Sequence, residues 1–549
     1  MKQLILYAIF LSIALNQLYP QTTIGLTQND TGTLNDGYVL FAPIGQTDTY
    51  LINTCGEQVK TWPSSYRPGQ SCYILPDGNL LRTGNTNNTT FNAGGKGGII
   101  EKIDWNGNVI WSYEISDATQ CQHHDIEALP NGNILVIAWD SKTNTEAIAQ
   151  GRDPSLVPET VWSEKVLEIE PVGTDGGTIV WQWNLWDHIV QEYDNTKPNF
   201  GVVNTNPQLI DLNYGGSATN SDWIHLNSID YNAALDQIVL SSHEFSEIWI
   251  IDHSTTTEQA SGSSGGNSGK GGDLLYRWGN PLAYNQSGAS AQLFRQHDAR
   301  WIQDGFPYEN QIIIFNNGNG RPGGNYTTVD IINPPVDGFN YTSTLPFLPA
   351  SPSYIYNEGN PNNLYSQNIS GSELLSNGNI LICDGPQGTF TEVNSSGTTV
   401  WTYINPAANS GIMTQGETPS ANPVFRANFY PDDYIGFAGH TLTAIGTIEN
   451  TNSISDDCNV TLSEEENIFA ETIAMYPNPA NDFIYITNSN AGIRNIRISN
   501  SSGQLLHIKS YASTVTEISI PVDHYTNGLY FIEISDDKST TTFTTVIDH

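Results

Sequence analysis

Three histidines stand at corresponding positions of a repeated sequence pattern. His124 lies in QCQHHDIEALPNGN, His225 in DWIHLNSIDYN and His297 in RQHDARWIQDG. Imidazole can act as a nucleophile, as a general acid or base, or as a metal ligand. Asn227 follows His225 by two positions, and strand side chains alternate, so both are predicted on one face. Three such histidines meeting at one point would form a functional site.

The elements that must position these histidines are short strands. One half of the repeat is an apolar run broken by Asp-Gly or Asn-Gly, the strongest local hairpin signal, at 73–84, 126–140 and 373–385. The other half is strand, glycine-containing turn and strand with a tryptophan near its end. Its copies are 50–62, 99–113, 165–183, 389–403 and a diverged copy at 247–279. This alternation is typical of four-stranded propeller blades.

The copies predict an all-β protein with a six-bladed β-propeller over residues 35–448. Blades begin near Gln70, His124, His225, His297 and Ser370, and a sixth combines strands from 37–63 with one from 420–448. Each histidine then enters the innermost strand of its blade, where it faces the central channel. An array of β-sandwiches is the alternative, although it explains the repeated tryptophan less well.

The other histidines are predicted to have different surroundings. His243, in SSHEFSEIWIID, begins a later strand of the third blade and can reach the same channel. His123 is expected to be the outward neighbour of His124. Structural roles are favoured for His188, His253 and His440, and His507, His524 and His549 belong to another domain.

The composition excludes several classes of partner. The 549 residues carry 57 acidic and 20 basic side chains, a formal charge of −37, which argues against nucleic acid and anionic membranes. Residues 1–21 have a lysine and then an apolar run too short to span a bilayer comfortably, which predicts a secretory signal peptide. No later segment is predicted to span a membrane. Five cysteines without C-x-x-C spacing allow a disulfide or two and argue against a cysteine metal site.

The C-terminal segment has its own pattern. Residues 467–549 predict a small β-sandwich of short strands, and 449–466 are acidic and polar, as expected for a linker. AMYPNPANDFIYITNS, followed by NGLYFIEI, resembles the C-terminal sorting domain of type IX secretion substrates. The resemblance implies export through the periplasm by the type IX machinery, to the cell surface or the medium. An ordinary adhesive β-domain is the alternative.

The histidine motifs resemble a family of enzymes. HHD before LPNGN, DWIHLNS and the pair Gln296–His297, on this repeat, are similar to the bacterial arylsulfate sulfotransferases. The resemblance covers about residues 35–448. It implies a six-bladed propeller that moves a sulfuryl group from a phenolic sulfate ester to a phenol, by a ping-pong mechanism through a sulfohistidine, without a nucleotide donor, cofactor or metal.

The resemblance also implies residue roles. His297 would be the transient nucleophile, His225 and Asn227 would bind the sulfuryl oxygens, and His124 would assist from the opposite wall. The family has an arginine in a Ser-Ser-Arg context where this chain has Ser241-Ser242-His243. Histidine replaces that charge only when protonated, so Arg300 or Arg321 is a candidate to compensate.

Two other functions are compatible with the sequence. The first is a non-catalytic surface propeller that binds glycans or polyphenols. The second is a metal-dependent hydrolase or lyase with the same histidines as ligands, although only Asp125 and Asp298 stand beside them in sequence.

Overall fold

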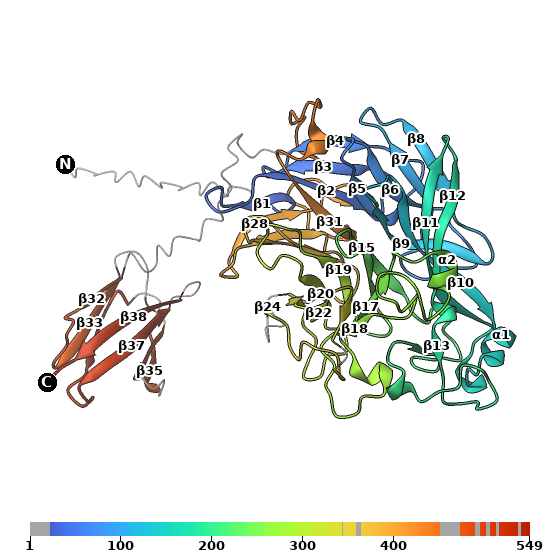
Figure 1. The fold of residues 1–549 in the computed structure, drawn as a ribbon. Helices are drawn as coiled ribbons and strands as arrows, with labels where there is room; N and C mark the ends of the chain where they lie inside the picture. The colour runs from blue at the N-terminus through green and yellow to red at the C-terminus, as the bar shows by residue number, and fades with distance from the viewer. Residues whose placement is uncertain are drawn as a thin grey trace, which may run out of the picture. The chain divides into compact units, whose positions relative to one another are not determined.

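The computed structural model describes residues 22–450 and 473–549, apart from 343, 358–363, 489–492, 494, 501–504, 512–514 and 536–539. The chain forms two compact units, Met1–Thr461 and Leu462–His549 (Figure 1). The predicted signal peptide, 1–21, lies outside the described residues, as does most of the predicted linker, from residue 451.

Six antiparallel sheets of four or five strands make up most of the described part of the first unit. Three of these sheets are β31 (Val424–Pro431)–β2 (Gly37–Pro43)–β3 (Thr49–Asn53)–β4 (Gln58–Trp62), β5 (Pro68–Ile74)–β6 (Leu80–Asn85)–β7 (Gly98–Ile103)–β8 (Val109–Glu114), and β9 (Gln120–Ala128)–β10 (Ile134–Thr143)–β11 (Thr160–Val172)–β12 (Gly176–Asn184). The other three are β15 (Leu226–Asn232)–β16 (Gln237–Ser242)–β17 (Glu247–Asp252)–β18 (Tyr276–Trp278), β19 (His297–Trp301)–β20 (Ile312–Asn316)–β21 (Thr328–Ile332)–β24 (Tyr354–Tyr356), and β25 (Gly371–Leu374)–β26 (Ile380–Asp384)–β27 (Thr389–Val393)–β28 (Thr399–Ile404)–β1 (Gly25–Asn29). The all-β class is therefore confirmed.

Helices and two-stranded pairs occupy the connections. The α-helices are α1 (Asn144–Ala149) and α2 (Thr257–Ala260), and 3-10 turns lie at Pro154–Leu156, Leu185–Asp187, Val203–Thr205, Pro281–Tyr284 and Ile435–Phe437. The pairs are β13 (Ile189–Val190) with β14 (Ile210–Asp211), β22 (Val336–Asp337) with β23 (Asn340–Tyr341), and β29 (Ala407–Ala408) with β30 (Gly411–Ile412).

Three predicted hairpins form with the same turn. Gly78, Gly132 and Gly378 have φ values of 81°, 88° and 86°, which glycine adopts readily. In each turn the leucine three residues before the glycine, for example Leu75, donates its N–H at 2.8 Å to the carbonyl of the asparagine that follows the glycine. The local sequence alone therefore determines these turns.

The repeated tryptophans connect neighbouring sheets. Trp62, Trp111, Trp183, Trp278 and Trp401 lie on the last or outer strands and are at most 4% exposed. Their indole N–H groups donate to the carbonyls of Asp104, Gly176, Gly272, Pro349 and Thr54, at 2.7–3.1 Å. Four of the acceptors lie later in the chain, within the residues that form the following sheet and its loops. The exception is Trp401 of the last sheet, whose acceptor is Thr54, between β3 and β4.

The first strands of the six sheets contact one another in order. β31 contacts β5, β5 contacts β9, β9 contacts β15, β15 contacts β19, β19 contacts β25, and β25 contacts β31. The sheet that holds β31 joins residues 424–431 to residues 37–62, so the two ends of this unit meet in one sheet.

The C-terminal unit has two antiparallel sheets. They are β32 (Ile473–Tyr476)–β33 (Phe483–Asn488)–β36 (Glu517–Pro521), and β35 (Leu505–Ser510)–β34 (Asn495–Asn500)–β37 (Gly528–Ser535)–β38 (Thr540–Ile547). Alternate side chains such as Ile484, Ile486, Ile496, Ile498 and Ile532 are buried in one shared core. This arrangement fits the predicted sandwich.

Candidate functional site

Irregular backbone presents the three predicted histidines. His225 directly precedes β15 and His297 begins β19, whereas His124 lies in the middle of β9 and not at the predicted entry of its strand. Register shifts fall at residues 123–125 of β9, at Asn227 of β15 and at Asp298 of β19. His124 and His225 have left-handed φ values of 50° and 55°, and Asp298 has 52°. A non-glycine residue in this region is strained by about 1–3 kcal/mol, and such strain concentrates at functional sites. The bulges re-aim side chains that regular strands would not bring together.

The three histidines meet, and His243 joins them. The ring centroids of His124 and His225 lie 4.6 Å apart, those of His225 and His243 5.1 Å, and those of His243 and His297 5.4 Å. Phe425 of β31 closes the group, 5.7 Å from the ring of His124 and 6.4 Å from that of His297. We call His124, His225, His243 and His297 the histidine cluster.

Each ring of the histidine cluster is held through Nδ1. The partners are Nδ1 of His123 for His124 at 2.8 Å, Asp222 for His225 at 2.5 Å, Glu244 for His243 at 3.0 Å and Asn317 for His297 at 2.8 Å. No described residue makes a hydrogen bond to Nε2 of these four rings. The cluster therefore offers four ring nitrogens for chemistry.

Asn317 fixes the tautomer of His297. Its amide N–H groups donate to the carbonyls of Ser366 and Ile369 at 2.9 and 3.0 Å, so its Oδ1 faces Nδ1 of His297 as an acceptor. Nδ1 must then carry the ring proton. Neutral His297 is left with a lone pair on Nε2, the atom a nucleophilic imidazole needs.

The environment gives the rings different charges. Burial is the main cause that lowers the pKa of His297 well below its ordinary value, and the nearby His243 lowers it further. Burial likewise lowers the pKa of His124 well below its ordinary value, and His225 lowers it further. Burial also lowers the pKa of His243, although Glu244 opposes it. The pKa of His225 is raised, because Asp222 outweighs the effect of burial. Of the four rings, His225 is therefore the one whose surroundings favour the imidazolium, whereas those of His124, His243 and His297 favour the neutral ring.

Asn227 links two sheets beside the cluster. Its amide donates to the carbonyl of Gln296 at 2.8 Å, and no described residue hydrogen-bonds its buried Oδ1. Gln296 in turn donates to Ser241 at 3.0 Å. The alternation argument does not apply here, because β15 begins after His225 and Asn227 is the extra residue of its bulge. Asn227 thus holds the backbone next to His297.

A family model matches the part of the chain that carries the histidine cluster. The family model described as Arylsulfotransferase (ASST) matches residues 73–429. The chain belongs to the arylsulfotransferase family. The match spans all four residues of the histidine cluster.

A second family model, for the secretion system C-terminal sorting domain, matches residues 474–548. The C-terminal unit therefore marks this arylsulfotransferase for export. Among the residues that the structure describes, no helix is long and apolar enough to cross a membrane.

Other comparisons add little. No curated protein matches this chain. A protein of unknown function from Bacteroides caccae is 11% identical with a TM-score of 0.38, covering 72% of this chain and 98% of its own. A streptogramin B lyase is 12% identical with a TM-score of 0.33 (75% and 95% covered), and the β-propeller domain of Myceliophteria thermophila Swd1 is 9% identical with a TM-score of 0.30 (70% and 87% covered). These TM-scores are too low to define the fold, which is defined by the strand pairing of the six sheets.

A guanidinium that the sequence did not single out lies beside the cluster of this family member. Nη1 of Arg295 is 3.4 Å from Nδ1 of His243 and ion-pairs with Glu244, which also accepts from His243. Arg295 has a left-handed φ of 58° just before His297, and its side chain is 39% exposed. Its place in RQHD was the available signal. Arg321, in contrast, packs over Phe294 and Tyr326.

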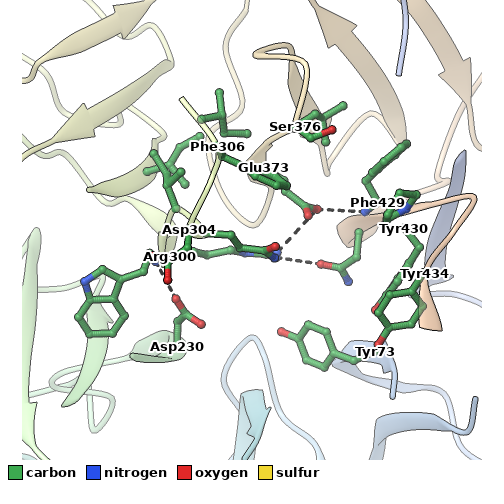
Figure 2. A pocket seen from close by; sticks show the side chains of 18 of the residues that line it. Tyr73, Asp230, Arg300, Asp304, Phe306, Glu373, Ser376, Phe429, Tyr430 and Tyr434 are labelled. Atoms are coloured by element: carbon green, nitrogen blue, oxygen red, sulfur yellow. Dashed lines mark hydrogen bonds and ion pairs between the residues drawn. The ribbon is translucent and has the colours of Figure 1, made fainter. Parts of the chain in front are cut away.

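Arg300 is not part of the cluster. It ion-pairs with Asp298 at 2.6 Å and donates to Asn428 at 2.9 Å. It lines a separate cavity of about 820 Å³ with Tyr73, Asp230, Glu373 and others, and none of the four histidines lines that cavity. Figure 2 shows Arg300 between Asp230 and Glu373.

Buried ion pairs connect this cavity to the cluster. Arg426 of β31 ion-pairs with Asp125 at 2.8 Å and with Asp298 at 3.0 Å, the residues that follow His124 and His297. It also donates to Tyr73 at 2.9 Å and lies over the ring of Phe425. The guanidinium of Arg426 thereby holds Phe425 and the two bulge residues, Asp125 and Asp298, in place.

A glycine loop presses on His124. A Cβ added to Gly95, whose φ is 80°, would lie 1.8–2.2 Å from three atoms of the imidazole. The Gly95 carbonyl accepts from the N–H of His124 at 2.7 Å. Only glycine fits this approach.

Histidines expected to be structural are paired elsewhere. His188 contacts Asp273, His253 contacts Asp236 and Glu168, and His440 stacks on Trp105. Cys55 is disulfide-bonded. Within the described ranges no group of three or more histidine, cysteine, aspartate or glutamate side chains is arranged to hold a metal ion.

Proposed function

We propose that this arylsulfotransferase moves a sulfuryl group from a phenolic sulfate ester to a phenol, without a nucleotide donor, through a sulfohistidine at His297. The observation that carries the proposal is the hydrogen bond from Nδ1 of His297 to Asn317, which leaves Nε2 as a lone pair. Burial keeps the ring neutral by lowering its pKa well below the ordinary value. A neutral imidazole both attacks and leaves well, so it can accept and release the group.

The other members of the cluster supply charge and protons. His225, as an imidazolium paired with Asp222, places an Nε2–H donor against the sulfuryl oxygens, and the free N–H of Asn227 adds a second donor. Donors aimed at the equatorial oxygens stabilise a loose in-line transition state. His124 is the general acid for the departing phenolate and the general base for the incoming phenol.

Arg295 takes part of the role of the family arginine. His243 has a lowered pKa and is neutral, so it does not replace that arginine's charge. Arg295 lies 3.4 Å from His243 and is partly exposed, so its charge is available to an anionic donor. Arg300, in the separate cavity, is not assigned to the sulfated substrate.

We further propose that the six sheets close into a six-bladed propeller around the cluster. The ordered contacts of the first strands and the hydrogen bond from Trp401 to Thr54 support closure. Residues 1–21 are assigned to a signal peptide, 35–448 to the propeller and 467–549 to the sorting sandwich, with β1 packed on β28 of the last sheet. Phenolic donors and acceptors would then be met outside the cell.

The test is a burst experiment on the full chain. The purified, metal-stripped protein is mixed with 4-nitrophenyl sulfate, with and without phenol, and peptides are mapped for an acid-labile sulfuryl adduct. We expect an adduct on His297 that phenol discharges and His297→Asn abolishes. His188→Asn, which alters a histidine away from the cluster, should leave the burst unchanged. Absence of nitrophenol release from pH 5 to 9 with several acceptors would overturn the assignment for aryl sulfates.

A further inference from the structure

A chain of buried hydrogen bonds leads away from the cluster behind His124. Nδ1 of His124 lies 2.8 Å from Nδ1 of His123, and Nε2 of His123 lies 2.8 Å from Oε2 of Glu164 on β11. All three side chains are at most 2% exposed. Trp139 stacks on the ring of His123 at 4.0 Å and holds it in place. A carboxyl group is therefore joined to the site through two imidazoles.

In each of these hydrogen bonds the donor and the acceptor can exchange roles. Two Nδ1 atoms at hydrogen-bond distance share one proton, since one of them must donate. When Glu164 is ionised, it accepts from Nε2–H of His123, Nδ1 of His123 accepts from His124, and Nε2 of His124 is a lone pair. When Glu164 is protonated, all of these bonds reverse and Nε2 of His124 carries a proton. The state of Glu164 thus decides whether His124 is an acid or a base.

The surrounding groups favour neutral imidazoles and a protonatable carboxyl group. Burial lowers the pKa values of His123 and His124 well below the ordinary value, and His225 lowers both further. Burial raises the pKa of Glu164, and Asp222 and Asp140 raise it further, whereas the Leu226 N–H and His225 oppose the rise. These groups come from β9, β10, β11 and residues 222–226, which lead into β15, and these strands pack together here.

We propose that Glu164, acting through His123 and His124, stores the proton that the two half-reactions exchange. The inference rests on the proposed sulfotransferase function and deepens it. Glu164 does not touch the substrate, so it is a positioning residue, whereas His124 touches the phenol oxygen.

The steps balance in atoms and charge. In the first half-reaction Nε2 of His297 bonds to sulfur and the bond from sulfur to the phenol oxygen breaks. The phenolate takes the Nε2 proton of His124, Nδ1 of His124 takes the proton of His123, and Nε2 of His123 takes that of Glu164. The negative charge of the sulfate ester is then on Glu164, since sulfonated His297 with Nδ1–H is neutral overall. The second half-reaction runs the same transfers backwards with the acceptor phenol.

Glu164→Gln tests the relay because the amide can be oriented in advance. Oε1 of Glu164 accepts from the Leu226 N–H at 3.0 Å, so the amide oxygen of the variant takes that place and its NH2 faces His123. His123 is then forced to donate from Nδ1, and the relay can neither give nor take a proton. Glu168→Gln is the matched control, a buried glutamate of the same strand whose Oε2 lies 3.1 Å from Nε2 of His253.

The rate of adduct formation on His297 is measured with two donors. 4-Nitrophenolate leaves without a proton, so Glu164→Gln should stay within about twofold of wild type with 4-nitrophenyl sulfate. Phenolate needs the proton, so phenyl sulfate should react on the order of a hundredfold more slowly, the usual size of general acid catalysis. With phenyl sulfate the wild-type rate should fall as pH rises and Glu164 loses its proton, whereas the variant should show no such fall. Glu168→Gln should behave as wild type with both donors.

Several outcomes would overturn the relay. One is an equal loss with both donors in Glu164→Gln, as a merely structural role predicts, while wild type still forms the adduct. If wild type forms no adduct with any donor, the proposed function has failed, and histidine nitrogen NMR still tests the relay alone. Glu164→Gln should hold the proton on Nε2 of His124 at every pH, whereas wild type should move it to Nδ1 as pH rises; identical spectra would refute the relay.

Discussion

Nδ1 of His297 donates a hydrogen bond to Oδ1 of Asn317, 2.8 Å away. Both side chains are at most 2% exposed, and the amide of Asn317 is oriented by two backbone carbonyls. A single neutral acceptor therefore sets the tautomer of His297 without adding a charge that would favour its protonation.

Asn317→Asp should move the pH dependence of adduct formation to higher pH. A carboxylate next to His297 stabilises the imidazolium and raises its pKa, typically by about 1–3 units. The protonated ring has no lone pair, so the burst with 4-nitrophenyl sulfate should be smaller than that of wild type at pH 6, by about tenfold for each unit by which the pKa of the ring exceeds the pH. It should recover at pH 9, where the ring is again neutral. Equal loss at both pH values would contradict this explanation.

Gly95→Ala should disable the enzyme while the protein still folds. The new Cβ would overlap the imidazole of His124, so the ring must move from its place in the cluster. We expect kcat/KM to fall on the order of a hundredfold, as for other misplaced catalytic groups. The left-handed φ of Gly95 should also lower the free energy of unfolding by about 1–2 kcal/mol.

Gly94→Ala is the control for that variant. A Cβ at Gly94 meets nothing within 4 Å, so activity should be unchanged and the free energy of unfolding should shift by no more than about 0.5 kcal/mol. Steady-state kinetics and chemical denaturation measure both quantities. Equal activity of the two variants would show that His124 does not act from its present position.

Arg295→Gln should weaken binding of the sulfated donor. The variant keeps a hydrogen-bonding side chain beside His243 and Glu244 but removes the permanent charge. Loss of one charge-assisted contact corresponds to about 1.5–3 kcal/mol, so KM for 4-nitrophenyl sulfate should rise about tenfold or more with a smaller change in kcat. Arg321→Gln removes a guanidinium that packs over Phe294 and Tyr326, so it should leave KM unchanged. A fall in kcat with constant KM would argue that Arg295 acts in another way.

Arg426→Met should destabilise the first unit. The substitution leaves the buried carboxylates of Asp125 and Asp298 without this partner, and breaking a buried pair in this way lowers the free energy of unfolding by about 3–5 kcal/mol. Lys102→Met breaks an exposed pair with Asp77 and should change it by less than about 1 kcal/mol. Chemical denaturation compares the two. Adding Asp125→Asn and Asp298→Asn to Arg426→Met should restore part of the loss; no restoration would mean that the unpaired charges are not the cause.

Local turns, strands and the residues that repeat with them could be predicted from the amino-acid sequence. Asp77-Gly78 and its equivalents specify a turn through the conformational freedom of glycine, and the alternating apolar residues specify strands. The position of His124, His225 and His297 within the repeat was enough to predict that they meet, because equivalent positions of repeated sheets occupy equivalent places in the fold.

The chemical role of each histidine, in contrast, depends on contacts that form when the chain folds. Asn317, which sets the tautomer of His297, directly follows β20, and Glu164, which reaches His124 through His123, lies on β11. The Nδ1 partners of the other three rings are near in sequence, but only folding aims them at the rings. A period of two residues is lost at a bulge, so the extra residue Asp298 changes the phase of β19, and strand alternation does not predict where Arg300 lies. The tertiary structure places Arg300 in the separate cavity. Arg295 enters the site through a left-handed backbone that no periodic pattern predicts. Patterns in sequence report local geometry, whereas the protonation of a ring depends on atoms that only folding brings within hydrogen-bond distance.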